Sequence, residues 1–549
     1  MDMQPEFGYR RRFVLSLMVG AMIFNADAGE GDVATVTNAL RSKITNIVVI
    51  YAENRSFDNL YGLFPGANGI PGVNPSSSGT YIAQIDRDAA QTPLKALPPV
   101  WGGVTTTGHQ PVVTQAQSAN LPNAPFRIES AFGITLPITI VTRDLAHRFY
   151  ENQMQIDGGR NDQFVAYGDS GALVMGYYDG GTMAMWKIAQ QYTLADNFFM
   201  GAFGGSFINH QYLICACAPE YPHADTVPAR PTLTLLEKDS QGHELPRLSL
   251  ASTSPPSAMD GPPAFAGSGN IAPANYFGDG KFHAVNTMQP AYQPSGNPPV
   301  ASDTKRLFAD PGKPTTLPPQ TQGTIGDLLD AKGVSWKWYS GAWKQASADR
   351  SLIYNGVWPN FQPHHQPFNY YAAFDPVTRA DARKAHLKDY DDLIADIHHG
   401  TLPAVAFYKP EGDLNQHAGY ASVQEGDSHI ADVIVNLQAG PQWKNMIIIV
   451  AYDENGGFWD HVAPPKGDAL GPGTRIPAII ISPYSKMGAV DHTQYDTGSI
   501  LRLITRRYGL DTLPGLSRRS QALTSNGAQP MGDLTAALNL PTAAASTGK

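Results

Sequence analysis

The stretch Asn46-Ile-Val-Val-Ile-Tyr-Ala-Glu-Asn-Arg-Ser-Phe-Asp-Asn-Leu-Tyr61 decides the fold of this chain. Residues 47–52 form an apolar run that is too short for an isolated helix, which is typical of a strand buried on both faces of a parallel α/β sheet. The run ends abruptly in Glu53, Asn54 and Arg55. Because ligands bind outside the carboxyl ends of such strands, Glu53 and Asn54 are candidate metal ligands. The alternative is that Glu53 caps a helix or pairs with Arg55.

A second stretch, Lys444-Asn-Met-Ile-Ile-Ile-Val-Ala-Tyr-Asp-Glu-Asn-Gly-Gly457, repeats this design. Its apolar run, residues 446–451, is followed by Asp453 and Glu454. Two buried strands of this kind would bring four oxygen-bearing side chains to one edge of one sheet. Clustered carboxylates repel each other and are costly to desolvate, so we expect a bound divalent metal ion there.

The composition indicates a large α/β domain with long ordered loops. The chain has 549 residues, of which 16% are charged, and it contains 53 Gly and 44 Pro. A formal net charge of -9 argues against a stable nucleic-acid partner, which would require a basic surface. We expect a single domain over residues 29–549, with a loop insertion at about 219–320 and a disordered tail at about 541–549.

Residues 1–28 have the features of an export signal peptide. Arg10, Arg11 and Arg12 precede an apolar segment at 13–24, and small residues at 26–28 would surround a cleavage site. The basic run also resembles a twin-arginine signal. These features predict a periplasmic or secreted protein without a transmembrane segment; the alternative is an N-terminal extension of a cytosolic protein.

A Gly-Gly-Ser turn at residues 204–206 connects a short apolar segment, 192–199, to a predicted helix that includes residues 211–217. It places the Ser206 hydroxyl at a helix N-terminus, where free N–H groups favour an anion such as phosphate. Ser206 is therefore either a nucleophile or a helix N-cap. The two cysteines, Cys215 and Cys217, are too close in sequence for an unstrained disulfide, so we expect them to pack as small hydrophobic residues.

Three histidines lie in segments with different expected structures. His147 lies in a stretch, residues 144–150, that predicts the start of a helix, whereas His365 and His417 lie in loops. Further helices and strands are expected on either side of these loops. The predicted strands are 334–339, 402–408 and 474–482, and the predicted helices are 324–332, 430–438 and 499–508.

Three motifs together resemble the bacterial phosphoesterase family. They are Glu-Asn-Arg-Ser-Phe-Asp-Asn at 53–59, Gly-Gly-Ser-x-x-Asn-His at 204–210, and Tyr-Asp-Glu-Asn-Gly-Gly-Phe-Trp-Asp-His-Val at 452–462. This family contains the respiratory-burst-inhibiting acid phosphatase and the phospholipases C that hydrolyse phosphatidylcholine, and it is related in fold to the alkaline phosphatase superfamily. The resemblance covers residues 44–515 and implies an α/β fold: a central, mostly parallel sheet flanked by helices, with long Gly/Pro-rich loop insertions.

The resemblance also implies a role for each candidate residue. Ser206 would be the nucleophile, and its oxygen would complete the coordination of the metal ion. The implied metal ligands are Glu53, Asn54, Asp453 and Glu454. The histidines implied to hold the phosphoryl oxygens are His147, His365 and His417, although each of them would otherwise be an ordinary hydrogen-bonded residue.

The identity of the expected metal ion stays open at this point. A set of oxygen ligands fits hard cations such as Mg, Mn or Ca. The related superfamily also uses Zn with histidine and carboxylate ligands, and His461 would then serve as a ligand; otherwise His461 has a structural role. We expect one principal metal ion.

The expected activity is that of an acid phosphatase. Ser206 would attack the phosphorus in line, and water would release phosphate from the phosphoserine intermediate. Histidines that are cationic in mild acid would favour an acidic optimum. Phospholipase C, acting on phospholipid headgroups, is the main alternative, but that branch usually carries a Thr nucleophile and extra β-rich modules. A non-catalytic binding protein with the same fold is the third possibility.

Overall fold

The computed structural model describes residues 30–356 and 358–540. The predicted export signal and the predicted disordered tail at 541–549 lie outside these residues. In the part that is described, no helix has the length and apolar character needed to cross a membrane.

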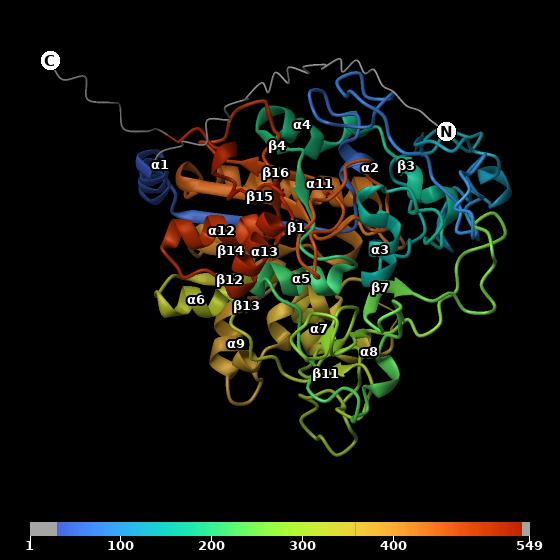
Figure 1. The fold of residues 1–549 in the computed structure, drawn as a ribbon. Coiled ribbons are helices and arrows are strands. Elements are labelled where there is room, and N and C mark those ends of the chain that lie inside the picture. The colour runs from blue at the N-terminus through green and yellow to red at the C-terminus, as the bar shows by residue number, and fades with distance from the viewer. Residues whose placement is uncertain (1–29, 357, 541–549) are drawn as a thin grey trace, which may run out of the picture.

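An eight-stranded sheet forms the centre of the molecule, and Figure 1 shows its strands side by side. All neighbouring strands are parallel except where β16 pairs with β15 and with β4, so the predicted, mostly parallel sheet is confirmed. The order across the sheet is β13 (Leu387–Lys388), β12 (Trp336–Ser340), β14 (Val405–Lys409), β1 (Asn46–Ala52), β15 (Met446–Tyr452), β16 (Ala478–Ile481), β4 (Thr193–Ala195) and β17 (Ala489–Asp491).

The two apolar stretches of the sequence are neighbours at the middle of this sheet. Strands β1 and β15 pair in parallel from Asn46 opposite Met446 to Ala52 opposite Tyr452, and every residue in both is buried. Because the two strands end at the same level, the polar residues that follow them emerge together at the carboxyl edge. The prediction from the two stretches is confirmed.

Helices flank the sheet in two packed groups. In one group α11 (Val423–Ala439) packs against α4 (Ala184–Gln191) and α10 (Tyr390–His399). In the other, α12 (Thr497–Tyr508) packs against α1 (Glu30–Lys43) and α5 (Ser206–Cys215). The predicted helix at 324–332 is α6 (Ile325–Ala331), and its N-cap Thr324 forms a capping box with Asp327.

The helix that was predicted to begin at Asp144 begins later. Its observed form is α3 (Phe149–Ile156), and Arg148 before it is extended. Side chains near this segment satisfy backbone groups that a helix would otherwise pair: the N–H of Ala146 donates to Asp169 Oδ1 over 2.9 Å. His147 therefore lies in an irregular segment, outside the helix.

The prediction that the two cysteines are free was wrong. Cys215 and Cys217 form a disulfide. Helix α5 ends at Cys215, and Ala216 adopts a left-handed conformation with φ 50°. This turn brings the two Cα atoms to 5.1 Å, which is inside the usual range for a disulfide.

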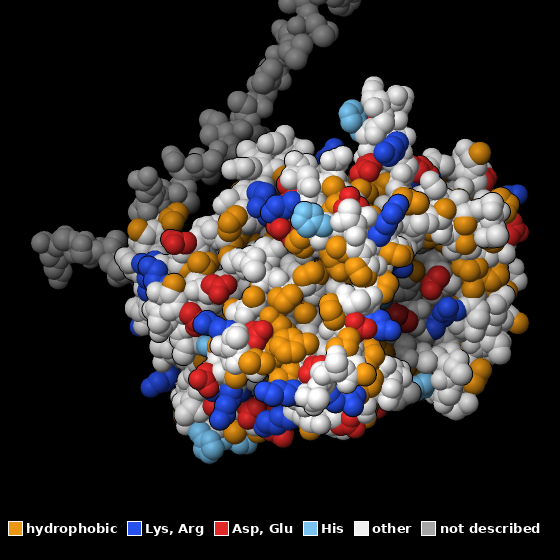
Figure 2. All heavy atoms as spheres, turned by 90° about the horizontal axis from the view of Figure 1, so that it is seen from below, with side chains coloured by type: hydrophobic (Ala, Val, Ile, Leu, Met, Phe, Trp, Pro, Cys, Tyr) orange, Lys and Arg blue, Asp and Glu red, His pale blue; other side chains and the backbone are white. Residues whose placement is uncertain are grey.

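The segment 219–320, where the sequence predicts a loop insertion, consists mainly of short paired strands and loops. Its paired strands are β6 (Leu236–Lys238) with β7 (Glu244–Leu248), β8 (Ile271–Ala272) with β9 (His283–Ala284), and β10 (Gln289–Pro290) with β11 (Thr316–Leu317). Asn286 attaches it to the start of α3, because its Oδ1 accepts the N–H of Phe149 over 3.0 Å. Figure 2 views the molecule from below the orientation of Figure 1, and acidic and basic side chains are interspersed on that face.

Candidate active site

Ser206 is the first residue of α5, and Gly205 occupies the N-cap position. The Ser206 hydroxyl makes no capping bond to the helix in the described structure; instead its Oγ lies 3.2 Å from Asn54 Oδ1 and 3.4 Å from Glu454 Oε1. The interpretation of Ser206 as an N-cap is therefore wrong. Its side chain is directed toward the polar edge of the sheet.

A glycine sets the turn that presents this hydroxyl. Gly204 has φ +87°, and a Cβ at this position would lie 2.6 Å from the backbone N and Cα of Phe149. Only glycine combines that backbone conformation with such a close approach. The turn before α5 is therefore fixed by the segment that also carries His147.

Four polar side chains at the ends of β1 and β15 are brought together as the sequence predicted. Glu53, Asn54, Asp453 and Glu454 are fully buried. The backbone N–H of Asn54 donates to Asp453 Oδ1 over 3.0 Å, which links the two strand ends. Since Ser206 contacts both Asn54 and Glu454, and Asn54 bonds Asp453, these four side chains share one small region. Glu53 directly precedes Asn54 at the edge of this region.

The chemistry of this region fits a divalent cation. Asp453 Oδ2 is buried and has no hydrogen-bond partner among the described residues. Burial raises the pKa of Asp453 to about 6 and that of Glu454 to about 8. A cation would accept the free oxygen lone pair and relieve the cost of two adjacent buried carboxylates.

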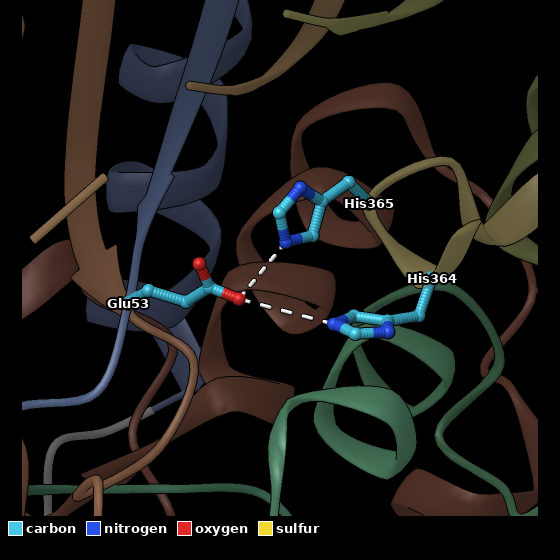
Figure 3. Close-up of side chains that lie close together, drawn as sticks. All are labelled: Glu53, His364 and His365. Atoms are coloured by element: carbon cyan, nitrogen blue, oxygen red, sulfur yellow. Dashed lines mark hydrogen bonds and ion pairs between the residues drawn. The ribbon is translucent and has the colours of Figure 1, made fainter. Parts of the chain in front are cut away.

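Glu53 is held by positively charged and hydrogen-bonding groups on its far side. His365 Nε2 lies 2.9 Å and His364 Nε2 lies 3.9 Å from Glu53 Oε1, and Figure 3 shows both rings pointing toward that oxygen. Lys409 Nζ lies 3.4 Å from Oε2. Burial acts to raise the pKa of Glu53, but Lys409 and then His365 hold that pKa well below its ordinary value. Glu53 is therefore ionised and fixed in position.

The adjacent residues His364 and His365 lie in different surroundings. His365 is fully buried behind Glu53, and burial lowers its pKa to about 3, so it is a neutral donor. His364 instead lines the cavity in front of Ser206. The sequence shows that the two histidines are adjacent. Their loop has no periodicity, however, that would indicate which of them faces the cavity.

His147 and His417 both face the cavity. His147 Nε2 lies 3.5 Å from Glu454 Oε1, and although burial opposes it, the carboxylates of Glu454 and Asp144 raise the pKa of His147 to about 9. The His417 ring stacks on Tyr420 with centroids 4.4 Å apart, and it lies 6.0 Å from the ring of His147. These two imidazoles are therefore on one side of the cavity.

The cavity itself has a volume of about 490 Å³ and opens from Ser206 toward the insertion. Ser206 lies in its wall together with the imidazoles of His147, His364 and His417. The polar residues contributed by the insertion and by the loop before His364 are Asn270, Asn286, Thr287 and Gln362.

His461 belongs to a separate cluster. Its Nδ1 lies 2.7 Å from Asp58 Oδ2, and Arg475 bonds Asp58 at 3.0 Å and Asp460 at 3.0 Å. Because Arg475 pairs with both carboxylates, the structure shows an ion-pair network at this position. His461 contacts this network, an arrangement that favours the structural role over zinc binding.

Solved structures match only distantly. The lipoteichoic acid synthase LtaP from Listeria monocytogenes aligns with 64% of this chain and 69% of its own, at 8% identity and a TM-score of 0.29. A protein of the alkaline phosphatase superfamily from Vibrio parahaemolyticus aligns with 39% of this chain and 50% of its own, at 14% identity and a TM-score of 0.21.

Sequence relatives match more closely. Phospholipase C B of Mycobacterium tuberculosis is 30% identical over 236 residues, which are 38% of this chain and 42% of that relative. The match to that relative therefore spans less than half its length. Phospholipase C A of the same organism is 23% identical over 537 residues, 92% of this chain and 79% of its own. The profile of the Phosphoesterase family matches residues 44–511. The chain belongs to the Phosphoesterase family.

Proposed function

We propose that the protein is a metal-dependent phosphoric ester hydrolase in which Ser206 Oγ attacks phosphorus. One observation carries this proposal: the Ser206 hydroxyl, at the N-terminus of α5, lies within 3.4 Å of both Asn54 and Glu454 in a cavity that three histidines line. Phosphoryl transfer needs mainly positioning and stabilisation of negative charge, and this cavity supplies both.

The residues of the chain divide the reaction between them. The bond from Ser206 Oγ to phosphorus forms as the bond to the leaving oxygen breaks, and water then hydrolyses the phosphoserine. A cation held by Glu53, Asn54, Asp453 and Glu454 would supply positive charge that favours the ionised Ser206 and neutralises phosphate. The N–H groups at the start of α5 face the same region and stabilise an anion there.

The cavity histidines hold the phosphoryl oxygens and supply the proton for the leaving oxygen. His147 and His417 have the roles expected from the sequence, whereas His364 replaces His365 as the third imidazole in contact with substrate. His365 becomes a positioning residue, because it acts on the substrate only through Glu53.

Phosphomonoesters are the substrates that this arrangement fits best. A monoester dianion presents three non-bridging oxygens, and the three imidazoles can donate one hydrogen bond to each of them. A diester has one of these oxygens blocked by its second substituent, so one imidazole would lose its partner. We therefore place acid phosphatase activity first.

Phospholipase C activity is the second candidate. The observation that favours it is the similarity to phospholipase C A of M. tuberculosis over 92% of this chain. The polar residues that line the cavity, Asn270, Asn286, Thr287 and Gln362, would then contact the headgroup of a phospholipid such as phosphatidylcholine.

The two candidates are separated by a direct comparison of substrates. Purified protein is assayed at about pH 5 to 7, near the histidine pKa, with a chromogenic phosphomonoester and with phosphatidylcholine, each with a Ser206→Ala variant and an EDTA-treated control. Monoester hydrolysis that disappears in Ser206→Ala and after EDTA treatment supports the phosphatase. Faster release of diacylglycerol, with the same dependence on Ser206, assigns a phospholipase C. Turnover of either substrate by Ser206→Ala at the wild-type rate contradicts the nucleophile.

We also propose that residues 1–28 direct export to the periplasm or the medium. The basic run at 10–12 and the apolar segment after it support this proposal. N-terminal sequencing of protein recovered from the periplasm and medium tests it. A start near residue 29 is expected, whereas an uncut chain confined to the cytosol contradicts export.

A further inference from the structure

A second, more open pocket lies beside the catalytic cavity. It has a volume of about 820 Å³ and shares Asp144, His147 and Arg148 with that cavity. Its other walls come from the loop at 102–107 and from Arg143, Asp169 and Gly419. A molecule bound at Ser206 would therefore reach this pocket by extending past His147.

Arg143 in this pocket has a guanidinium without a partner. Within residues 30–356 and 358–540 its side chain makes no hydrogen bond or ion pair, and its Nε is buried. Its backbone is held in place, since the N–H donates to Val104 O over 2.8 Å. A partly buried cation without a partner is costly, and a guanidinium is best satisfied by the two oxygens of a carboxylate or phosphate.

A glycine makes room for this guanidinium. Gly102 has φ +80°, and a Cβ on it would lie 2.9 Å from Arg143 Nη1. Any other residue at 102 would have to displace the guanidinium and would also be strained in that conformation. The loop wall and the arginine are therefore fitted to each other.

The acidic groups of the pocket are occupied by other partners. Asp169 Oδ1 accepts bonds from the N–H of Ala146 and from the Ser170 hydroxyl, at 2.9 Å and 2.7 Å. Asp144 Oδ1 accepts the N–H of Leu145 and lies 3.7 Å from His147 Nδ1.

The second arginine of the pocket is occupied as well. Arg148 Nη2 donates to Gly269 O over 2.9 Å and to Asn270 Oδ1 over 3.2 Å, so it holds the insertion in place. Arg143 is thus left as the cation of the pocket that a bound anion would satisfy.

We propose that this pocket binds a second anionic group of the substrate, a phosphate or a carboxylate, through Arg143 while the scissile phosphate lies at Ser206. The proposal rests on the hydrolase function proposed above and narrows its substrates to phosphoesters that carry another anion. It assigns Arg143 to substrate selection, away from the reacting atoms.

The test compares matched substrates that differ in the second anion. Fructose 1,6-bisphosphate is compared with fructose 6-phosphate, and 3-phosphoglycerate with glycerol 3-phosphate. We expect the wild type to have a kcat/KM about tenfold higher for the doubly anionic member of at least one pair, as expected for one charge-assisted contact. Preference in the first pair assigns a phosphate, and preference in the second assigns a carboxylate.

Substitutions of Arg143 then test whether this residue causes the preference for doubly anionic substrates. In Arg143→Met we expect the two substrates of a pair to have nearly equal kcat/KM. Arg143→Lys is expected to keep part of the wild-type preference. The control is Arg127→Met, because Arg127 is exposed and pairs with Asp179 at 3.0 Å; it is expected to keep the wild-type ratio. If Arg143→Met does not fold, Arg143→Lys and the wild-type ratio still decide.

Two results would overturn the proposal: equal kcat/KM within both pairs for the wild type, or a wild-type ratio that survives in Arg143→Met. Either result leaves hydrolysis at Ser206 intact, because a chromogenic monoester without a second anion would still be turned over. Absence of all Ser206-dependent hydrolysis would instead reject the proposed function, and with it this proposal.

Discussion

Lys409 Nζ lies 3.4 Å from Glu53 Oε2, and both side chains are completely buried. Glu53, Asp453 and Glu454 together carry three negative charges when they are ionised. One divalent cation and the Lys409 ammonium would supply three positive charges, and His147 adds positive charge beside Glu454. A second divalent cation would leave the buried region with a larger excess of positive charge. This charge count is the reason why we expect a single metal ion with a fixed ammonium beside it.

Removing this ammonium should change the affinities for cations and anions in opposite directions. In Lys409→Met the region gains a net negative charge, so we expect the Kd for a divalent cation to fall severalfold and the inhibition constant of inorganic phosphate to rise about tenfold. Calorimetric titration with Mg and Mn and competition kinetics measure the two quantities. Lys337→Met, which removes a lysine paired with Asp396 at 2.6 Å, is the matched control. A loss of both affinities would show a structural role only.

A divalent cation should stabilise the folded protein. At about 100 times its Kd, a ligand that binds only the folded state adds roughly 3 kcal/mol to the free energy of unfolding. We expect Mg or Mn to raise the melting temperature, EDTA to lower it, and Asp453→Asn to remove most of the shift. The control is Asp413→Asn, since Asp413 is exposed. An equal cation-dependent shift in Asp453→Asn would contradict the assignment of this ligand.

The turn before Ser206 should not tolerate a side chain. Gly204→Ala places a Cβ 2.6 Å from the Phe149 backbone, in addition to the cost of a positive φ. We expect a destabilisation of about 3 kcal/mol and a loss of activity.

Gly242 provides a matched comparison for this turn, because it has φ +86° and no atom within 4 Å of the added Cβ. Gly242→Ala should cost only about 1 kcal/mol and keep activity. Denaturant unfolding and monoester assays compare the two variants. Similar effects in both would contradict the role assigned to the close approach.

His429 should make the protein less stable in acid. Burial lowers its pKa to about 4, and its Nε2 lies 2.6 Å from the Tyr408 hydroxyl. Between the pKa of an unfolded histidine, about 6.5, and this value the unfolded chain binds more protons, so stability is lost as the pH falls. Because the side chain is partly exposed, we expect a contribution of about 1 to 2 kcal/mol.

Substitution of His429 should remove this part of the pH dependence. His429→Gln is expected to flatten the unfolding free energy between pH 6.5 and pH 4, the two pKa values, relative to the wild type. His398→Gln, which replaces an exposed histidine of α10, should leave the profile unchanged. Identical profiles for the wild type and His429→Gln would contradict the account.

The sequence was sufficient for the features that depend on local patterns. The apolar runs of β1 and β15 and the polar residues directly after them predicted the middle of the sheet and the clustering of Asn54 with Asp453. The Gly-Gly-Ser turn likewise predicted the position of Ser206, because a strand, a tight turn and a helix determine it locally.

Features that depend on long-range contacts were missed. In the sequence Lys409 only follows the predicted strand 402–408, and nothing local shows that it faces Glu53. His364 and His365 differ in role because Trp338 Nε1 bonds the His365 carbonyl over 2.7 Å, a contact 27 residues away. The disulfide was missed because it depends on a left-handed conformation of Ala216, the residue between the two cysteines. A glycine at this position would have indicated such a conformation in the sequence, but an alanine does not.

The central claim is that Ser206 carries the phosphoryl group during the reaction. The most direct measurement is acid quenching of the enzyme during turnover of a phosphomonoester, followed by mass spectrometry of its peptides. We predict a phosphorylated peptide whose modified residue is Ser206, present in the wild type and absent from Ser206→Ala. Turnover without any phosphorylated peptide in the wild type, or phosphate on another residue, would contradict the account.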